Sequence, residues 1–308
     1  IDSFNFFPIS EENNTFSNLF IWGENNKYNN FFTKSFENQF NQEKINFKKF
    51  CNSIVLGSSV SDNYYRNIIT FLPRIFFINQ QNVSIALHRS SSNKFRAFIR
   101  SILNNLDIKL KEFIFLDDNF YKFESSQIPQ FFNKEISIEI LRNYFSKYRS
   151  NKKEQKVKIY VSRQNSNYRN LINEGDIIDE LKSKDFKIID PNNISIIDQI
   201  KLFSSAEVII SPTGSALTNI IFAPKDAQVI EITPKYSNNY EEIFKNRYSD
   251  ICKIIGLNYK FIEADPIDVE PVKNKISNFI PEKVLKESNY YKNLIIGKNK
   301  FNKVINDY

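Results

Sequence analysis

Apolar runs and stretches of helical periodicity alternate along the first half of the chain, after about 50 polar, asparagine-rich residues that predict irregular structure. A continuous apolar run predicts a buried strand, and apolar positions every three to four residues predict an amphipathic helix. The expected order is strand 52–57, helix 62–78, strand 83–87, helix 93–106, strand 112–116 and helix 136–148.

The same alternation restarts after the charged segment 150–156, which we interpret as a linker because it has no apolar residue. Two of the later helices have capping patterns, Asn173 with Asp176 and Ser195 with Asp198. The expected order is strand 157–162, helix 173–184, strand 186–189, helix 195–204, strand 207–210, short helix 215–222, strand 228–232, helix 239–255 and strand 259–262.

Strands separated by helices predict parallel sheets built from right-handed crossovers. Two such sets in tandem predict an α/β protein with two Rossmann-like domains that face a cleft. We place the domains at 1–150, with 1–50 as an irregular extension, and at 151–271, followed by a basic helical tail at 272–308.

Composition excludes several classes of protein. The 308 residues are 41% hydrophobic and 25% charged, which is ordinary for a globular chain and does not fit a disordered or fibrous one. Cys51 and Cys252 are expected to be reduced thiols, although pairing is open. One histidine cannot form a multi-histidine zinc site. Because the chain has no methionine, we expect a segment to have been removed from its start.

The net charge of +7 favours anionic partners such as nucleotides, phosphates or lipid headgroups, or else reflects lysines spread over the surface. A nucleic-acid partner is not expected, since the chain has no RRM, OB-fold or helix-turn-helix signature.

The most informative motif is EVIISPTGSALTN (207–219), in which a buried strand enters a turn of small residues and then a helix. Free backbone N–H groups at a helix N-terminus attract anions, and open α/β sheets bind ligands at the carboxyl ends of their strands. Gly214 would let a phosphate approach the backbone, and Ser215 and Thr218 would add hydroxyl donors. The alternative is a turn that serves packing alone.

Two further motifs carry arginines. The segment YVSR (160–163) ends a strand with Ser162 and Arg163 on the same sheet edge as Gly214, where an arginine suits phosphate binding. Arg169 follows. The segment NYYR (63–66), followed by LPR (72–74), opens the first helix of the first domain and would face the cleft. In both cases the alternative is a solvated surface arginine.

In this order and spacing, the motifs resemble glycosyltransferase family 61, which includes bacterial capsule and lipopolysaccharide enzymes, plant xylan-decorating enzymes and animal O-linked N-acetylglucosamine transferases. The resemblance is dense over 157–234 and patchier over 63–74. It implies a GT-B fold, an inverting transfer from a nucleotide sugar held by the second domain, and no metal or other cofactor. Asp117 and Asp118 are interpreted as a turn and not as a metal motif.

The resemblance also implies donor-site residues. Arg163 would be the main diphosphate ligand, the helix end at Gly214 and Ser215 would assist, and Glu231 would accept a hydrogen bond from a ribose hydroxyl. The positions that match the family pattern are Ser162, Arg163, Arg169, Asn173, Glu174, Gly214, Ser215, Thr218, Asn219 and Glu231.

The chain departs from the family pattern at three positions. Thr213 replaces the usual histidine before Gly214, and Arg66 and Thr70 replace the usual histidine and aspartate of the first domain. An inverting transfer needs a base near the acceptor hydroxyl. Asp62 and His88 are the candidates, and Arg66 would instead bind a charged acceptor or the donor phosphate.

We therefore expect a glycosyltransferase of surface polysaccharide synthesis, with a polysaccharide or glycolipid acceptor. The alternative is a degenerate member that binds a nucleotide or glycan without turnover. We expect a cytoplasmic protein. Its basic tail is open to two interpretations, peripheral contact with the anionic inner membrane of a bacterium or a packed closing helix.

Overall fold

The computed structural model describes residues 48–58, 62–117, 121–148, 156–166, 168–236, 242–267 and 287–308. The chain divides into two compact units, Ile1–Leu141 (unit 1) and Arg142–Tyr308 (unit 2). The predicted irregular extension up to residue 47, most of the predicted linker, Asp118 and the stretch 268–286 lie outside the described residues. The mixture of helices and parallel sheets confirms the predicted α/β class.

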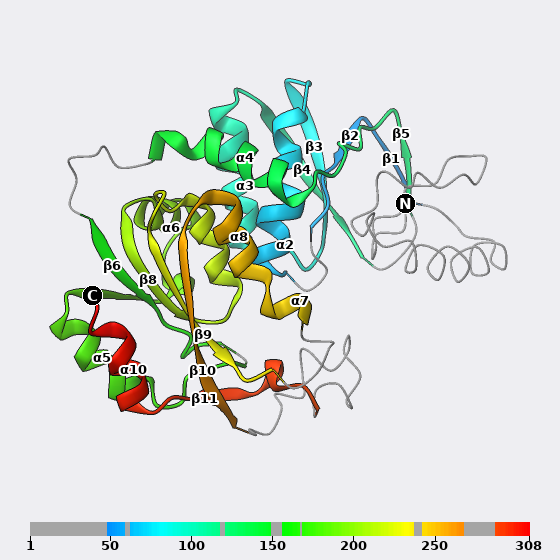
Figure 1. Ribbon diagram of the computed structural model, residues 1–308. Coiled ribbons are helices and arrows are strands. Elements are labelled where there is room, and N and C mark those ends of the chain that lie inside the picture. The colour runs from blue at the N-terminus through cyan, green and yellow to red at the C-terminus, as the bar shows by residue number, and fades with distance from the viewer. Residues whose placement is uncertain are drawn as a thin grey trace. The chain divides into compact units, whose positions relative to one another are not determined.

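Unit 1 is built on a parallel sheet of β2 (Ser53–Val55), β3 (Asn82–His88) and β4 (Lys109–Leu116), in the order β2-β3-β4 (Figure 1). A second parallel pair joins β1 (Lys48–Cys51) to β5 (Tyr121–Glu124). The predicted strands at 52–57, 83–87 and 112–116 are confirmed, whereas the β1–β5 pair was not predicted.

The predicted helix 62–78 is a sequence of three helical types. A single α-turn, α2 (Tyr64–Arg66), continues as the π-helix η2 (Asn67–Phe71) and then as the 3-10 helix η3 (Leu72–Phe77). Pro73 cannot donate a backbone hydrogen bond, which explains why a regular α-helix does not continue through this segment. The buried side chains Ile68, Phe71 and Leu72 nevertheless keep one face of the segment in the core.

The other helices of this half follow the predicted periodicity. Helix α3 (Asn93–Asn105) begins at Ser92, whose side chain accepts a hydrogen bond from the Phe95 N–H group as an N-cap. Helix α4 (Lys134–Tyr144) spans the division between the units and ends in the 3-10 turn η4 (Phe145–Tyr148).

Unit 2 has a sheet of β6 (Val157–Val161), β7 (Phe186–Ile189), β8 (Ala206–Pro212), β9 (Gln228–Pro234), β10 (Asn258–Ile267) and β11 (Asn293–Ile295). Its order is β11-β10-β9-β8-β6-β7, and only β11 runs antiparallel to its neighbour. The parallel strands therefore follow the doubly wound order 2-1-3-4-5, whose topological switch point lies between β6 and β8.

Helices cover both faces of this sheet. Helices α5 (Glu174–Ser183) and α10 (Lys298–Ile305) share one core cluster with the sheet. The other face carries α6 (Ile196–Ser204), the 3-10 helix η6 (Ser215–Phe222) and α8 (Arg247–Ile255), as Figure 1 shows.

Three predictions for this half need correction. The predicted helix 239–255 is broken at Asn246 into α7 (Glu242–Lys245) and α8 in its described part. The predicted helix 215–222 is a 3-10 helix. The described part of the tail, Glu287–Tyr308, is not wholly helical, because β11 extends the sheet before α10 begins. Leu294 is fully buried there, which explains why this short segment pairs with the edge of β10.

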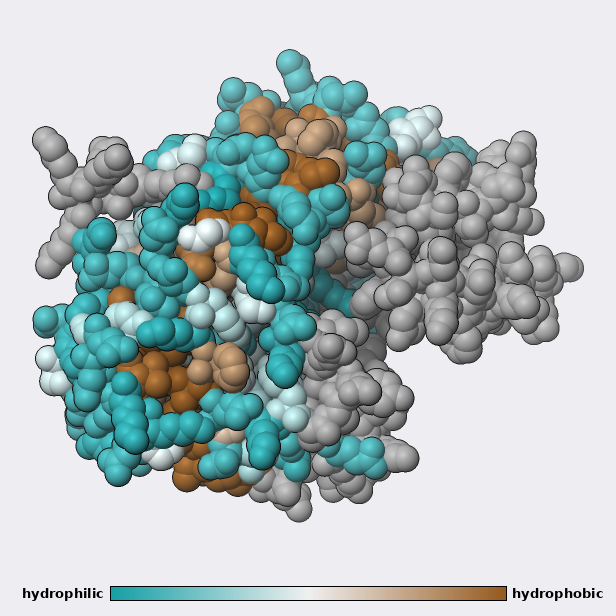
Figure 2. All heavy atoms as spheres, in the orientation of Figure 1, coloured by the Kyte–Doolittle hydropathy of each residue, from teal (hydrophilic) through white to brown (hydrophobic). Residues whose placement is uncertain are grey.

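In the coloured part of the face shown in Figure 2, hydrophilic side chains predominate, and hydrophobic areas lie among them. Among the residues that the structure describes, no helix combines the length and the hydrophobicity that a bilayer crossing requires. Cys51 is exposed and Cys252 is buried, and both are free thiols.

Candidate functional site

The candidate site of unit 2 lies at the switch point of its sheet. Ser162 and Arg163 follow β6 directly, and Thr213 and Gly214 follow β8. Because β6 and β8 are parallel neighbours, their carboxyl ends meet at one sheet edge. This is the edge at which open α/β sheets bind ligands. The structure thus brings together the two motifs that the sequence places in separate segments.

Gly214 and Arg163 are in close contact at this edge. A Cβ atom on Gly214 would overlap with Nη1 of Arg163, so any larger residue would displace the guanidinium from this position. The φ angle of Gly214 is 175°, an extended conformation that any residue adopts. Space, and not backbone conformation, therefore requires the glycine, and the guanidinium lies directly over the turn.

The guanidinium of Arg163 has unused hydrogen-bonding capacity. Nη2 donates to the carbonyl oxygen of Tyr168 at 3.0 Å, while the buried Nε has no partner. Burial, together with the nearby charge of Arg169, lowers the pKa of Arg163 to about 10, so the group is still a cation at neutral pH. A desolvated cation with a free donor stabilises a bound anion.

Glu174 fixes the chain segment that carries Arg163. The buried carboxylate accepts hydrogen bonds from the hydroxyls of Tyr160 and Ser162, both at 2.7 Å, and from the Arg163 N–H group at 3.4 Å. These bonds tie the first turn of α5 to the end of β6. The predicted donor contacts of Ser162 and Glu174 stay predictions, and in this structure the two side chains bond to each other.

Asn173 has a different role from the expected helix cap. It occupies the N-cap position of α5, but its side chain makes no capping hydrogen bond. Instead its Nδ2 donates to the carbonyl oxygen of Ile296 at 2.8 Å, and its Oδ1 accepts from the Ile296 N–H group at 3.2 Å. Asn173 therefore fastens the C-terminal segment after β11 to α5.

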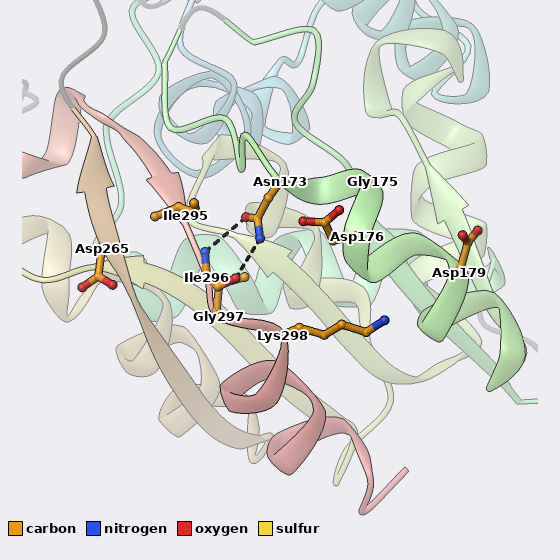
Figure 3. A pocket seen from close by; sticks show the side chains of 9 residues that line it. All are labelled: Asn173, Gly175, Asp176, Asp179, Asp265, Ile295, Ile296, Gly297 and Lys298. Carbon is orange, nitrogen blue, oxygen red and sulfur yellow. Dashed lines mark hydrogen bonds between the residues drawn. The ribbon is translucent and has the colours of Figure 1, made fainter.

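Figure 3 shows these two bonds at the rim of a surface pocket with a volume of about 680 Å³. The pocket is also lined by three aspartates, Asp176, Asp179 and Asp265, and by one lysine, Lys298. Of the predicted donor-site residues only Asn173 contributes to it. An acidic rim repels a diphosphate, so we do not assign the donor to this pocket.

Arg169 holds the turn before Gly214 from the inside. Its Nε donates to the carbonyl oxygen of Thr213 at 3.0 Å, and its Nη1 donates to that of Tyr290 at 3.3 Å. The guanidinium lies over the Tyr290 ring, 3.9 Å from its centroid. The backbone φ of Arg169 is 59°, a left-handed conformation that costs energy for a non-glycine residue. The residue is buried, and it positions the turn.

Helix η6 contains the other predicted hydroxyl and amide groups. Thr218 donates its hydroxyl to the carbonyl oxygen of Ser215 at 2.6 Å, and Asn219 donates to the Gln199 side chain at 2.8 Å. Both side chains are fully buried, whereas Ser215 is half-buried. Contact of Thr218 and Asn219 with a donor stays a prediction, and Ser215 is the member of this group that is accessible.

Glu231 lies inside unit 2, on β9. Its side chain is 1% exposed, Oε2 accepts a hydrogen bond from the Tyr259 hydroxyl at 2.7 Å, and the buried Oε1 has no hydrogen-bond partner. Burial raises its pKa to about 7, against the opposing effects of Thr213, Tyr259 and Arg169. The predicted bond between Glu231 and a ribose hydroxyl stays a prediction. For this bond to form, the buried carboxylate would have to become accessible.

Asp62 is a partly buried carboxylate in unit 1. Oδ1 accepts a hydrogen bond from the Asn67 side chain at 2.9 Å. Burial raises the pKa of Asp62, while hydrogen bonds from the backbone and side chain of Ser92 and from Asn67 oppose the shift. Its φ of 48° is again left-handed. A carboxylate held in a strained position with a raised pKa fits a general base.

His88 fits this role less well. The residue is buried, and its Nδ1 accepts a hydrogen bond from the Ser90 N–H group at 3.1 Å and lies 2.7 Å from the Ser90 hydroxyl. Because Nδ1 is an acceptor, the neutral ring carries its proton on Nε2. In this tautomer the lone pair of Nδ1 is already engaged by the Ser90 N–H group.

The two arginines of the segments NYYR (63–66) and LPR (72–74) lie in different environments. Arg66 is partly buried in the last turn of α2. Arg74, expected at the cleft or in solvent, is 1% exposed. Its Nε donates to the Pro129 carbonyl oxygen at 2.7 Å, and its Nη2 donates to that of Val55 at 3.1 Å. Its guanidinium lies 4.0 Å from the centroid of the Phe131 ring, so it is a structural residue of the core.

Three tyrosines of this site were not predicted. Tyr168 accepts the Arg163 bond, Tyr248 donates its hydroxyl to the Gly214 carbonyl oxygen at 2.6 Å, and Tyr290 stacks on Arg169. Tyr168 could have been found from its place in the sequence between Arg163 and Arg169. Nothing in the sequence distinguishes Tyr248 and Tyr290 from other tyrosines, because only tertiary contacts bring them to the turn.

Across the described ranges, no group of three or more histidine, cysteine, aspartate or glutamate side chains could hold a metal ion. The groups that converge are instead the partly buried Arg163, a glycine turn and the N-terminus of η6. Together with the doubly wound sheet, they define an α/β protein with a candidate site for an anionic ligand.

Comparison with known proteins identifies the family. The model of the family "Glycosyltransferase 61" matches residues 64–230, more than half of the chain. The chain therefore belongs to the glycosyltransferase 61 family, which confirms the resemblance inferred from its motifs. The match includes both units and contains all the predicted site residues except Asp62 and Glu231.

Two curated proteins are similar to the chain. The EGF domain-specific O-linked N-acetylglucosamine transferase of Drosophila melanogaster is 24% identical over 201 residues, which are 64% of this chain and 29% of that protein. The protein of the same name from Mus musculus is 23% identical over 112 residues, 35% of this chain and 20% of that protein. The chain thus spans less than a third of the length of either relative.

Proposed function

We propose that the protein is an inverting glycosyltransferase that moves a sugar from a nucleoside-diphosphate donor to a polysaccharide or glycolipid acceptor. The observation that carries the proposal is Arg163, a partly buried cation whose buried Nε has no partner, held against Gly214 at the switch point of unit 2. In this proposal the chain has the GT-B arrangement, in which unit 2 binds the donor and unit 1 binds the acceptor.

The proposed reaction is a single displacement. The acceptor hydroxyl attacks the anomeric carbon, the bond from that carbon to the diphosphate oxygen breaks, and the hydroxyl proton passes to a base. Arg163 and the backbone N–H groups at the start of η6 stabilise the charge that develops on the departing diphosphate. Asp62 is the proposed base, since it is a partly buried carboxylate whose pKa is raised by burial.

The acceptor class and location are also proposals. A role in surface polysaccharide synthesis on the cytoplasmic side of a bacterial membrane rests on the resemblance to bacterial capsule and lipopolysaccharide enzymes. The names of the two relatives add another candidate donor, a nucleotide that carries N-acetylglucosamine. We also infer from the family that transfer needs no bound metal ion, so activity is expected to survive EDTA.

A second candidate function is binding without turnover. It is favoured by Arg66 and Thr70, which replace the ionisable pair usual at these positions of the family. Nucleotide affinity without sugar transfer, measured with a panel of acceptors, would support this alternative.

The donor site is tested by thermal unfolding in the presence of nucleotides and nucleotide sugars. One nucleoside diphosphate is expected to raise the melting temperature of the wild type, and Arg163→Ala is expected to abolish the shift. Arg163→Lys keeps the charge but loses the planar guanidinium, and is expected to retain part of the shift. The control is Lys253→Ala, which removes an exposed cation of α8 in the same unit.

A wild-type protein that responds to no nucleotide would contradict the donor site. So would a response that Arg163→Ala and Lys253→Ala retain equally.

A further inference from the structure

Unit 1 has a shallow groove between α3 and the edge strand β4 that the donor site does not explain. Its volume is about 410 Å³, within the range of small-ligand pockets. Helix α3 contributes two arginines one turn apart, and β4 contributes two phenylalanines from alternate positions on one face. The lining residues are Asn93, Arg96, Ala97, Arg100, Phe113 and Phe115.

The arginines and phenylalanines form two stacked pairs. Cζ of Arg96 lies 5.1 Å from the centroid of the Phe115 ring, and Cζ of Arg100 lies 5.6 Å from that of Phe113. The two ring centroids are 6.4 Å apart. Phe115 is 48% exposed, which is unusual for a large apolar side chain beside charged neighbours. Flat apolar surface and cationic groups are therefore presented side by side.

The charge of the groove lining is positive. No hydrogen bond or ion pair joins the exposed Arg100 guanidinium to any residue that the structure describes. The lining of the groove has two arginines and no acidic residue. A partner that carries negative charge is complementary to this surface.

Arg96 is ordered within the groove. It donates to the Ser91 carbonyl oxygen and to the Asn93 side chain. These bonds hold the guanidinium in place, which lowers the entropic cost of binding a ligand.

The groove begins beside the proposed general base. Ser92, the N-cap of α3, donates hydrogen bonds to Asp62, and Arg96 is close enough for its charge to favour the ionised form of that carboxylate. Asn93 and Arg96 are in the first turn of the same helix. A chain that presents a hydroxyl to Asp62 can therefore continue along the groove, over the two phenylalanines.

We propose that this groove binds an anionic sugar residue of the acceptor glycan, next to the residue that receives the transferred sugar. The inference rests on the proposed function. The C–H face of a pyranose ring packs on an exposed Phe ring, and a carboxylate or phosphate on the sugar pairs with the guanidinium of Arg100. A peptide fits less well, since the lining side chains on this face provide few hydrogen-bond acceptors for its backbone N–H groups.

Two oligosaccharides of matched length and linkage test the groove. Hexagalacturonate carries a carboxylate on every sugar, whereas maltohexaose has the same linkage and no charge. Isothermal titration calorimetry at physiological ionic strength is expected to show binding of hexagalacturonate and much weaker binding of maltohexaose. Arg100→Ala and Phe115→Ala are each expected to weaken hexagalacturonate binding about fivefold to tenfold.

Two further variants separate shape from charge. Arg100→Lys keeps the charge and is expected to restore only part of the affinity, and Phe115→Leu keeps apolar volume but removes the flat ring. The control Lys253→Ala removes one exposed positive charge in unit 2 and is expected to bind like the wild type. Thermal unfolding of every variant establishes that each is folded.

Three results would overturn the proposal: no binding of hexagalacturonate, an equal loss with Lys253→Ala, or unchanged affinity with Phe115→Ala. Hexaglutamate is a further probe. If this acidic peptide binds as tightly and with the same dependence on Arg100 and Phe115, the surface is a peptide site and the glycan proposal is wrong.

The same samples are titrated with the nucleoside diphosphate that stabilises the wild type. If that nucleotide binds and hexagalacturonate does not, the groove proposal fails and the donor site stands. If hexagalacturonate binds through Arg100 and Phe115 and no nucleotide binds, the proposed transferase function fails, and with it the role of the groove as an acceptor site.

Discussion

At the scale of single residues, the candidate donor site depends on one close contact. Arg163 reaches the turn after β8 only because position 214 has no side chain. Arg169 then fixes the carbonyl oxygen of Thr213, and Tyr248 fixes that of Gly214. The turn is thus held from two sides by buried donors, and a free guanidinium nitrogen lies over it.

This contact predicts a coupled effect of two substitutions. Gly214→Ala places a methyl group where Nη1 of Arg163 lies, and is expected to lower the free energy of unfolding by about 1–3 kcal/mol. In the Arg163→Ala background the same substitution should cost much less, because the clashing group is gone. Urea unfolding of the four proteins gives the coupling free energy. Additive effects would show that the guanidinium can move aside at no cost.

Glu231 predicts a pH dependence of stability. Burial raises its pKa in the folded protein to about 7, above the value of 4.5 for an unperturbed glutamate. The folded state therefore binds more protons than the unfolded state between these values. This contribution to stability is present below about pH 4.5 and is lost as the pH rises through about 7, by roughly 3 kcal/mol in total.

The measurement is urea unfolding of Glu231→Gln and the wild type from pH 4.5 to 8. The wild type should lose stability relative to Glu231→Gln as the pH rises. The exposed Glu263→Gln is the matched control and should follow the wild type. A difference between Glu231→Gln and the wild type that does not change with pH would mean that Glu231 is ionised throughout this range.

At the scale of elements, the sequence predicts well what periodicity and topology determine. The strands and helices that flank the switch point follow the predicted order, and Arg163 and Gly214 meet because both follow neighbouring parallel strands. The strands β1, β5 and β11 were missed, since each is short and depends on pairing with a distant partner. The inward bonds of Glu174, Thr218 and Asn219 were missed for the same reason, because spacing places a residue near an edge but does not show where its side chain bonds.

The correction at Asn173 leads to a prediction about the C-terminal elements. Asn173→Ala removes both side-chain bonds to Ile296 and is expected to destabilise the protein by about 1–3 kcal/mol. Hydrogen exchange should increase most in β11 and α10. The control is Asn192→Ala, an exposed asparagine of the same unit. If Asn173→Ala instead abolishes the nucleotide response with no change in stability or exchange, its role as a donor ligand is supported.

At the scale of the whole molecule, the residues proposed for donor binding and those proposed for acceptor binding and proton transfer lie in different units. The proposed diphosphate ligands are in unit 2, while Asp62 and the groove of α3 and β4 are in unit 1. The family match includes segments of both units, and the sequence departs from the family pattern mainly in unit 1, at Arg66 and Thr70. Donor binding and sugar transfer should therefore be separable by mutation.

Asp62→Asn is the substitution that separates them. It keeps the size of the side chain but removes the proton acceptor, so the rate of sugar transfer should fall about 10²–10⁴-fold. The nucleotide-induced rise in melting temperature should be unchanged, because Arg163 and Gly214 are untouched. Asp107→Asn, at an exposed aspartate of unit 1 with a left-handed φ of 56°, is the control for loss of a negative charge. If Asp62→Asn transfers sugar at the wild-type rate, another group must accept the proton. His88→Gln then becomes the next variant, since a catalytic histidine would have to adopt the tautomer that its bond from Ser90 disfavours.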